Sequence, residues 1–294
     1  MYELKQIGPR TYYFPGPAQV GVFDCGDGTV CLIDGGSDKD AARRMLRAVT
    51  EQGWQVRAVC NTHSHADHIG GNRYWQEQTG CRIFAPGIEC AFTRQPIMES
   101  TVLFGAFPPD PLRHKFLLAQ PSDAELLTPE VLPAGLTFFP LPGHCMDMVG
   151  YDTCDGVAFM ADSLCSADIL NKYHMTYVFD VGTYLETLRT LPEHRAALYV
   201  PAHVPVLTDL RELVQINEQA VYAVGQTLCE LCAAPLPTDE VIARACAHYN
   251  LHMNFQQYAL EGSTVRSYLS WLYQCGRMRV IEQDPMLLWQ TAEA

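Results

Sequence analysis

Residues 61–78, NTHSHADHIGGNRYWQEQ, place three histidines and an aspartate within six consecutive positions. His63 and His65 alternate along an extended segment, so their imidazoles point to the same side. Asp67 and His68 follow the bend in the chain, so their side chains can face a second metal ion. Buried imidazoles and carboxylates need partners, so a plain hydrophobic core does not account for this crowding. We interpret the cluster as half of a site for two metal ions.

The remaining donors are expected at the ends of other strands. His144 follows TFFPLPG, Asp162 ends VAFMAD, and His203 ends ALYVPAH. A carboxylate between two ions can bridge them, which is the role expected for Asp162. The predicted first site is His63, His65 and His144, the second is Asp67, His68 and His203, and Asp162 and a hydroxide are shared.

Strand and helix patterns alternate around the histidine cluster. Two strands are expected in residues 18–34, joined by the turn-forming Gly26-Asp27-Gly28. The segment 37–53 has helical spacing, with Ala41, Met45, Leu46 and Val49 on one side. Strands at 57–62 and 81–86 flank a helix at 69–80. This rhythm is typical of an α/β fold.

Residues 88–130 interrupt the rhythm with a segment rich in proline, phenylalanine and leucine. We interpret it as an inserted lid, with Phe104, Phe107 and Phe116 as candidate substrate contacts. Strands then resume within 137–163, and a strand at 197–203 follows a helix at 184–194. A helix over 208–232 is expected to begin with a capping box formed by Asp209 and Glu212.

The segment after APLP (234–237) has the outline helix, helix, β-hairpin, as in a winged helix. Residues 236–294 contain four arginines, no lysine and six carboxylates, a balance that disfavours binding to a nucleic-acid backbone. We expect a module for packing or dimerisation, or a part of the pocket wall.

Composition limits the class of protein. The 294 residues are 48% hydrophobic and 18% charged, which predicts a folded protein with a proper core. A net charge of −13 disfavours non-specific binding to nucleic acid or to an anionic membrane. The sequence has neither a signal-peptide pattern nor a transmembrane run, so we expect a cytoplasmic protein with free thiols. Cys145 and Cys165, and the pair Cys229 and Cys232, are interpreted as packing residues.

The motifs THSHADHIGG, PGH (142–144), MADS around Asp162, PAH (201–203) and the upstream LIDGG (32–36) together resemble the metallo-β-lactamase superfamily, nearest in motif to glyoxalase II. The resemblance covers residues 1 to about 232, and all seven ligand positions match in order. It implies a four-layer αββα sandwich with the metals at one edge. We therefore expect a catalytic domain at 1–232, with the lid at 88–130, and a winged-helix-like module at 233–294.

The resemblance also implies that Asp34 steadies the ligands. Two divalent ions, zinc or alternatively iron or manganese, would activate water for hydrolysis. Asp67 or Asp162 would take up the proton of the nucleophile and pass it to the leaving group.

The substrate is less well defined by the sequence. After Asp162 the chain carries a single lysine, Lys172, instead of the basic set with which glyoxalase II holds glutathione, and Cys165 stands where related lactonases have a tyrosine. We expect a small carboxylic ester, thioester or lactone as substrate. The alternatives are a phosphodiesterase or ribonuclease of the same fold, and a mononuclear-iron oxygenase acting on a persulfide.

Overall fold

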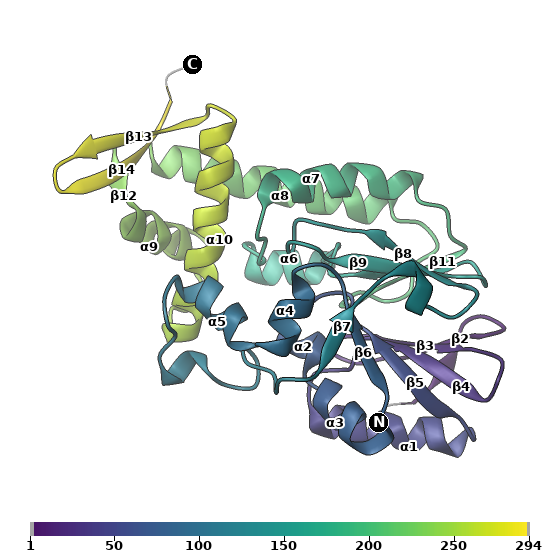
Figure 1. Cartoon of the computed structure of the whole chain (residues 1–294). Coiled ribbons are helices and arrows are strands. Elements are labelled where there is room, and N and C mark those ends of the chain that lie inside the picture. The colour runs from purple at the N-terminus through teal and green to yellow at the C-terminus, as the bar shows by residue number, and fades with distance from the viewer. Residues whose placement is uncertain (1–2, 293–294) are drawn as a thin grey trace.

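Two β-sheets face each other in the computed structural model, which describes residues 3–292, and helices cover the outer face of each sheet (Figure 1). Helices α1 and α3 lie on the first sheet, and α7 and α8 lie on the second. This arrangement confirms the predicted αββα sandwich.

The first sheet has seven strands in sequential order, antiparallel from β1 to β4 and parallel from β4 to β7. Helix α1 (Lys39–Glu51) connects the parallel pair β4 and β5, and Asp38 caps it by accepting a hydrogen bond from Ala41 N–H. Its residues Ala41, Met45 and Val49 are buried against the sheet, as the helical spacing predicts. Helix α3 (Asn72–Thr79) lies between β5 and β6 in the chain. The strands are β1 (Lys5–Gln6), β2 (Thr11–Phe14), β3 (Val20–Asp24), β4 (Thr29–Ile33), β5 (Gln55–Cys60), β6 (Arg82–Ala85) and β7 (Ala124–Leu126).

The second sheet has the order β11-β10-β9-β8, and its pair β10 and β11 is parallel whereas the other two pairs are antiparallel. Its strands are β8 (Leu136–Pro140), β9 (Val149–Thr153), β10 (Val157–Ala161) and β11 (Leu198–Pro201). The associated helices are α6 (Ala167–Tyr173), α7 (Val181–Thr190), the 3-10 turn Leu191–Glu193 and α8 (Arg211–Leu231).

Helix α8 begins later than its sequence pattern predicts. The residue before its first turn is Leu210, which makes no side-chain cap, and Asp209 instead accepts a hydrogen bond from Arg211 N–H. The capping-box prediction is therefore wrong, because Asp209 lies one residue too early to reach the third helical N–H.

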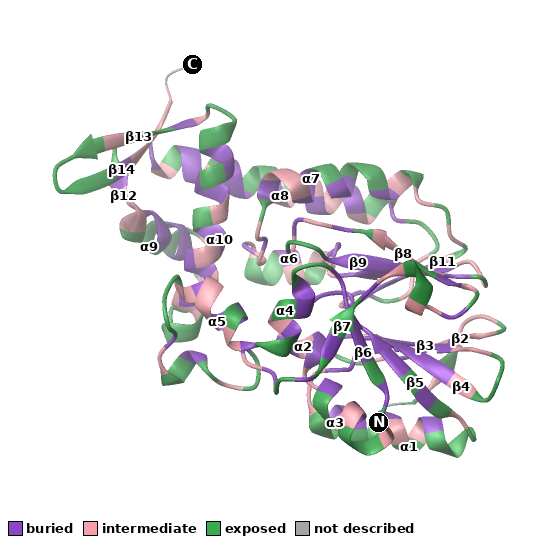
Figure 2. Ribbon diagram, in the orientation of Figure 1, coloured by how far each residue is buried: buried purple, intermediate pink, exposed green. Residues whose placement is uncertain are grey.

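The inner faces of the two sheets form one apolar core. Phe23, Ile33 and Phe84 of the first sheet meet Tyr151 and Phe159 of the second. The central strands of both sheets are largely buried (Figure 2), so an unpaired polar side chain on their inner faces would be costly.

The segment expected to form the lid, residues 88–130, contains short helices followed by one strand of the first sheet. Helices α4 (Glu89–Arg94) and α5 (Ile97–Phe104) and the 3-10 turn Asp110–Leu112 form its first part. Residues 124–126 are not lid but the edge strand β7, paired with β6, and a 3-10 turn at Pro129–Val131 follows. The segment that interrupts the alternation of strands and helices is therefore shorter than residues 88–130.

The C-terminal segment folds into β12 (Leu236–Pro237), α9 (Thr238–His248), α10 (Phe255–Gln274), β13 (Met278–Gln283) and β14 (Met286–Thr291). A single hydrophobic core includes Leu188 and Val221 on one side of residue 232 and Val265 and Leu269 on the other. Helix α10 also packs against α5 of the lid (Figure 1). The division into two domains at residue 232 stays a prediction. Among the helices within residues 3–292, none has the length and apolar character required to span a bilayer.

Glu261 of α10 gives the fold a measurable dependence on pH. Its side chain is 7% exposed, its Oε2 has no hydrogen-bond partner within residues 3–292, and burial raises its pKa from 4.5 to about 7. The folded state therefore binds this proton more tightly, so the contribution of Glu261 to stability is fully present below about pH 4.5 and is lost as the pH rises through 7. We expect Glu261→Gln to stabilise the protein by on the order of 2–3 kcal/mol at pH 8 and little at pH 4.5. Denaturant unfolding at both pH values checks this, and equal stabilisation at both would contradict it.

Candidate metal centre

The seven predicted ligands meet at one edge of the sandwich. Each comes from a loop that follows a strand: residues 63–68 follow β5, His144 follows β8, Asp162 follows β10 and His203 follows β11. Within the first loop, residues Ala66–Ile69 form the short helix α2, which carries Asp67 and His68. The ring centroids of His63 and His68 lie 4.1 Å apart. The structure thus brings together all the residues singled out by spacing.

His63, His65 and His144 form the first group of donor atoms. His65 Nδ1 lies 3.0 Å from His144 Nε2, and the ring centroids of His63 and His65 are 4.7 Å apart. Burial lowers the pKa of His65 and of His144 to about 4 and lowers that of His63 well below its usual range. Their imidazoles are therefore neutral, the form that binds a metal.

Asp67, His68 and His203 form the second group. Asp67 Oδ2 lies 3.3 Å from His203 Nε2 and 3.8 Å from His68 Nε2. His68 is buried, whereas the Asp67 side chain is 41% exposed and lies at the open side of the group.

Asp162 lies between the two groups. Its Oδ1 is 3.2 Å from His68 Nε2, and its Oδ2 is 3.1 Å from His203 Nε2 and 3.6 Å from His144 Nε2. The charge of Asp162 raises the pKa of His203 to about 11, against the opposing effect of burial. This position between the groups is the one required of a bridging carboxylate.

The donor atoms at the centre of the site are better suited to binding a metal ion than to forming hydrogen bonds with one another. His63 Nε2, His68 Nε2 and Asp162 Oδ1 are buried and make no well-aligned hydrogen bond in the described part of the chain, although His68 Nε2 and Asp162 Oδ1 lie 3.2 Å apart. An unpaired buried polar atom is costly, and a bound cation would satisfy all three of these donor atoms. Imidazole nitrogen and carboxylate oxygen suit zinc, iron or manganese.

Asp34 anchors the loop that carries the histidines. Its carboxylate accepts hydrogen bonds from Thr62 N–H (2.8 Å) and the Thr62 hydroxyl (2.9 Å), and its Oδ2 lies 2.8 Å from His68 Nδ1. Asp34 itself adopts a left-handed backbone (φ 69°). This contact suits the steadying role that the resemblance implies for Asp34, since a partner on the outer nitrogen orients a ligating ring.

The other four histidines are held in the same way. In each, one ring nitrogen faces the centre and the other meets an anchor: His63 meets Thr62 Oγ1 (2.9 Å), His144 the Tyr177 carbonyl (3.1 Å), His203 the Pro17 carbonyl, and His65 the Cys145 thiol (3.2 Å). Sequence reasoning missed these anchors because two of them are backbone carbonyls, which any residue type supplies.

Gly143 allows the chain to reach the site before His144. Its φ is 119°, and a Cβ at this position would lie 2.4 Å from the backbone nitrogen of Tyr184. The PGH motif therefore needs its glycine for a close approach between this loop and α7.

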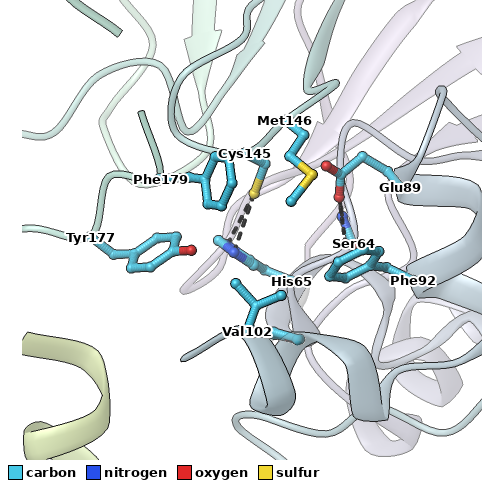
Figure 3. A pocket seen from close by; sticks show the side chains of 10 residues that line it. Ser64, His65, Glu89, Phe92, Val102, Cys145, Met146, Tyr177 and Phe179 are labelled. Atoms are coloured by element: carbon cyan, nitrogen blue, oxygen red, sulfur yellow. Dashed lines mark hydrogen bonds between the residues drawn. The ribbon is translucent and has the colours of Figure 1, made fainter. Parts of the chain in front are cut away.

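A pocket lies beside His65 (Figure 3). In this view, Cys145 and Tyr177 point toward the His65 ring, and Phe92 and Val102 of the lid contribute to the wall. The residues that line the pocket are Ser64, His65, Glu89, Phe92, Glu99, Val102, Cys145, Met146, Tyr177 and Phe179.

Two buried glutamates of the lid reach this pocket, and the sequence pattern did not single them out. Glu89 Oε2 accepts a hydrogen bond from Ser64 N–H (3.1 Å), and its Oε1 accepts one from Asp147 N–H (3.3 Å). Burial raises the pKa of Glu99 well above its usual range, and the charges of Asp67 and Glu89 raise it further. Only the tertiary structure reveals these carboxyl groups, because a glutamate on a short lid helix is ordinarily exposed.

The three phenylalanines expected to contact substrate lie elsewhere on the lid. Phe107 and Phe116 are 71% and 70% exposed, and Phe104 packs edge-on against Phe255 of α10. None of the three lines the pocket beside His65 in the part of the chain that the structure describes. Substrate contact by these side chains stays a prediction.

The cysteines near the ligands differ in their surroundings. Cys145 lines the pocket, whereas the backbone of Cys165 is held by the side chain of Asn217. All twelve cysteines are free in the structure.

Comparison with known proteins covers most of the chain. Residues 13–203 match the family model of the metallo-beta-lactamase superfamily. A hydroxyacylglutathione hydrolase from Rhodopseudomonas palustris (strain BisB18) is 28% identical over 218 residues, which are 74% of each chain. A second one, from Bradyrhizobium sp. (strain ORS 278), is 27% identical over 206 residues, 70% of this chain and 71% of the relative.

Solved structures share the fold. A metallo-beta-lactamase family protein from Thermus thermophilus superposes with a TM-score of 0.70 at 19% identity and covers 98% of both chains. A beta-lactamase domain protein from Burkholderia ambifaria has a TM-score of 0.70 at 18% identity, with 99% of this chain and 94% of that chain covered. The DIM-1 metallo-beta-lactamase covers 75% of this chain and 97% of its own, with a TM-score of 0.58 at 10% identity.

Removal of the Asp34 carboxylate tests the anchoring of the histidine loop. Asp34→Asn keeps the size of the side chain but weakens its contacts to Thr62 and His68. We expect zinc affinity to fall roughly 10- to 100-fold, as measured by competition with a chromophoric chelator. Asp27→Asn, in the exposed turn between β3 and β4, is the control and should leave the affinity unchanged. Unchanged affinity in Asp34→Asn would contradict the anchoring role.

Proposed function

Because the chain belongs to the metallo-beta-lactamase superfamily and is a hydrolase of that fold, we propose that it cleaves a small carboxylic ester, thioester or lactone with two divalent ions. His63, His65 and His144 would hold the first ion, Asp67, His68 and His203 the second, and Asp162 would bridge them. The observation that carries this assignment is the cluster of three buried donor atoms without partners among the described residues at the centre. Zinc is the proposed metal, with iron and manganese as alternatives.

Bound ions of this kind lower the pKa of water from 15.7 toward 7 and polarise a carbonyl group. The chain supplies the proton acceptor. Both histidine contacts of Asp67 use Oδ2, so Oδ1 would be the oxygen that takes the proton of the attacking water and passes it to the leaving group. Both oxygens of Asp162 face histidines, which suits it to bridging instead.

The pocket beside His65 favours an ester over a phosphodiester. Its described lining residues include Phe92, Val102 and Phe179 and two glutamates, but no lysine or arginine. A phosphodiester carries a negative charge, and no basic side chain among these lining residues would neutralise it. The relatives named hydroxyacylglutathione hydrolases support the inclusion of thioesters among the substrates.

A substrate panel on zinc-loaded protein tests this proposal. Small thioesters, lactones and bis-p-nitrophenyl phosphate are compared by kcat/KM. Hydrolysis of a thioester or lactone well above that of the phosphodiester is expected, and turnover of the phosphodiester alone would establish a phosphodiesterase or ribonuclease instead.

Metal analysis tests the number of ions and the reaction class. Two equivalents of metal per chain are expected, with loss of hydrolysis after chelation and recovery when metal is restored. One iron per chain, together with oxygen uptake on a persulfide, would overturn the hydrolytic proposal.

Substitution of Asp67 tests the proposed proton acceptor. Asp67→Ala should lower kcat by roughly 10²- to 10⁴-fold, because both a ligand and the acceptor are removed. Its circular dichroism should stay unchanged, since the side chain is partly exposed and has no part in the core. Asp123→Ala, an exposed residue before β7, is the control. Full activity in Asp67→Ala would contradict the assignment.

A further inference from the structure

Glu89 is a buried acidic residue at the start of the lid, in the first turn of α4. It is 3% exposed, and the proposed mechanism does not use it. Its two oxygens accept hydrogen bonds from the two loops that carry the first group of histidines. A buried acidic side chain is costly unless it is well paired, so the partners of Glu89 indicate what it does.

One oxygen of Glu89 binds the loop that carries His63 and His65. Oε2 accepts a hydrogen bond from Ser64 N–H (3.1 Å) and another from the Ser64 hydroxyl. Ser64 lies between the two histidines in the chain and is itself buried. A shift of the backbone at Ser64 would therefore move both imidazoles together.

The other oxygen of Glu89 binds the loop that follows β8 and carries His144. Oε1 accepts a hydrogen bond from Asp147 N–H (3.3 Å). The contact is reciprocal, because Asp147 Oδ2 accepts a hydrogen bond from Ile88 N–H (2.7 Å). Gly87 permits this close approach, since a Cβ at its position would overlap Asp147 Oδ2. The start of the lid is thus bound to both ligand loops.

The three groups that meet the oxygens of Glu89 are all hydrogen-bond donors, two N–H groups and one hydroxyl. A carboxylate has two accepting oxygens and no donor, so it fits this set. A glutamine amide has one accepting oxygen, and its NH₂ group would face a donor of Ser64 or Asp147. A glutamine could therefore bind one of the loops, but it could not join the two.

We propose that Glu89 is a positioning residue for the first metal ion, which it serves by joining the two ligand loops through one carboxylate. It would keep His65 beside His144, where His65 Nδ1 and His144 Nε2 lie 3.0 Å apart. The inference rests on the proposed assignment of His63, His65 and His144 to that ion. It makes the lid a support of the metal centre as well as a wall of the pocket.

The second group depends less on Glu89. His68 is held by Asp34, and His203 is held by the Pro17 carbonyl. In the part of the chain that the structure describes, the side chain of Glu89 forms hydrogen bonds with Ser64 and Asp147 alone. The loss of its carboxylate should therefore weaken the first ion more than the second.

Zinc affinity in proteins with one remaining site tests this difference, measured on the full chain by competition with a chromophoric chelator. His203→Ala removes a ligand of the second ion and keeps the first group intact, whereas His144→Ala does the reverse. Glu89→Gln is then added to each. We expect it to lower the affinity roughly 10- to 100-fold in the His203→Ala protein and at most about threefold in the His144→Ala protein, because outer partners of metal ligands have effects of the larger size.

An unchanged affinity in the His203→Ala protein would overturn the proposal. An equal fall in both proteins would also overturn it, because it would reveal a general role in folding. Glu261→Gln is the matched control, since Glu261 is also a buried glutamate but lies on α10, which carries none of the seven candidate ligands. It should leave both affinities unchanged, and a fall of the same size would show that the effect does not belong to Glu89.

If the wild-type protein binds no zinc, the proposed function fails, but the joining of the two loops can still be measured. Amide hydrogen exchange reports the hydrogen bonds of Ser64 N–H and Asp147 N–H to Glu89. Glu89→Met removes both accepting oxygens, so it should speed exchange in residues 61–69 and in residues 143–149, whereas Glu261→Gln should not. Faster exchange throughout the chain, in one loop alone or in neither would overturn the proposal.

Discussion

The structure of the site depends on the placement of five imidazoles around one buried centre. Each ring presents one nitrogen to that centre and is held through the other by a protein group. Polar atoms turned inward in this way repel one another or remain unpaired unless a cation joins them. The anchoring groups therefore hold the imidazole nitrogens in an electrostatically unfavourable arrangement, and a bound cation would offset that unfavourable free energy.

The αββα sandwich provides these positions because its strands end at a common edge. The buried strands have little room for polar side chains, so the donors lie in the loops just beyond them. Donors from four strand ends converge without any one loop having to be long. The left-handed backbone at Asp34 and Ala161 marks the places where the chain turns sharply to aim a carboxylate at the site.

The lid and the C-terminal segment complete the site from the other side. Helix α10 packs on α5, which carries Glu99, and also lines a groove that adjoins the pocket at Val102. The C-terminal segment shares one core with α7 and α8 instead of lying apart from them. Its low content of basic residues disfavours a role in nucleic-acid binding.

The seven candidate ligands and the α/β architecture could be predicted from the sequence. Histidine and aspartate at fixed spacing, each just after an apolar run, carry local information that does not depend on the rest of the chain. The anchoring of His68 by Asp34 was also accessible, because it follows from a motif. The start of α8 and the strand at 124–126 could not be predicted from the sequence, because helix caps and edge-strand pairing depend on neighbours in space.

The pocket was decided by the tertiary structure alone. Phe107 and Phe116 are strongly apolar in the sequence, yet the fold leaves them exposed, whereas Glu89 and Glu99 are charged in type and buried. Residue type predicts burial only on average, and short lid helices have little periodic pattern to correct it. The sequence by itself therefore determined the chemistry at the centre, through ligand types and their spacing. Which side chains line the pocket beside His65 was set by the packing of the lid between α10 and the histidine loop, because contacts between distant segments have no local signature.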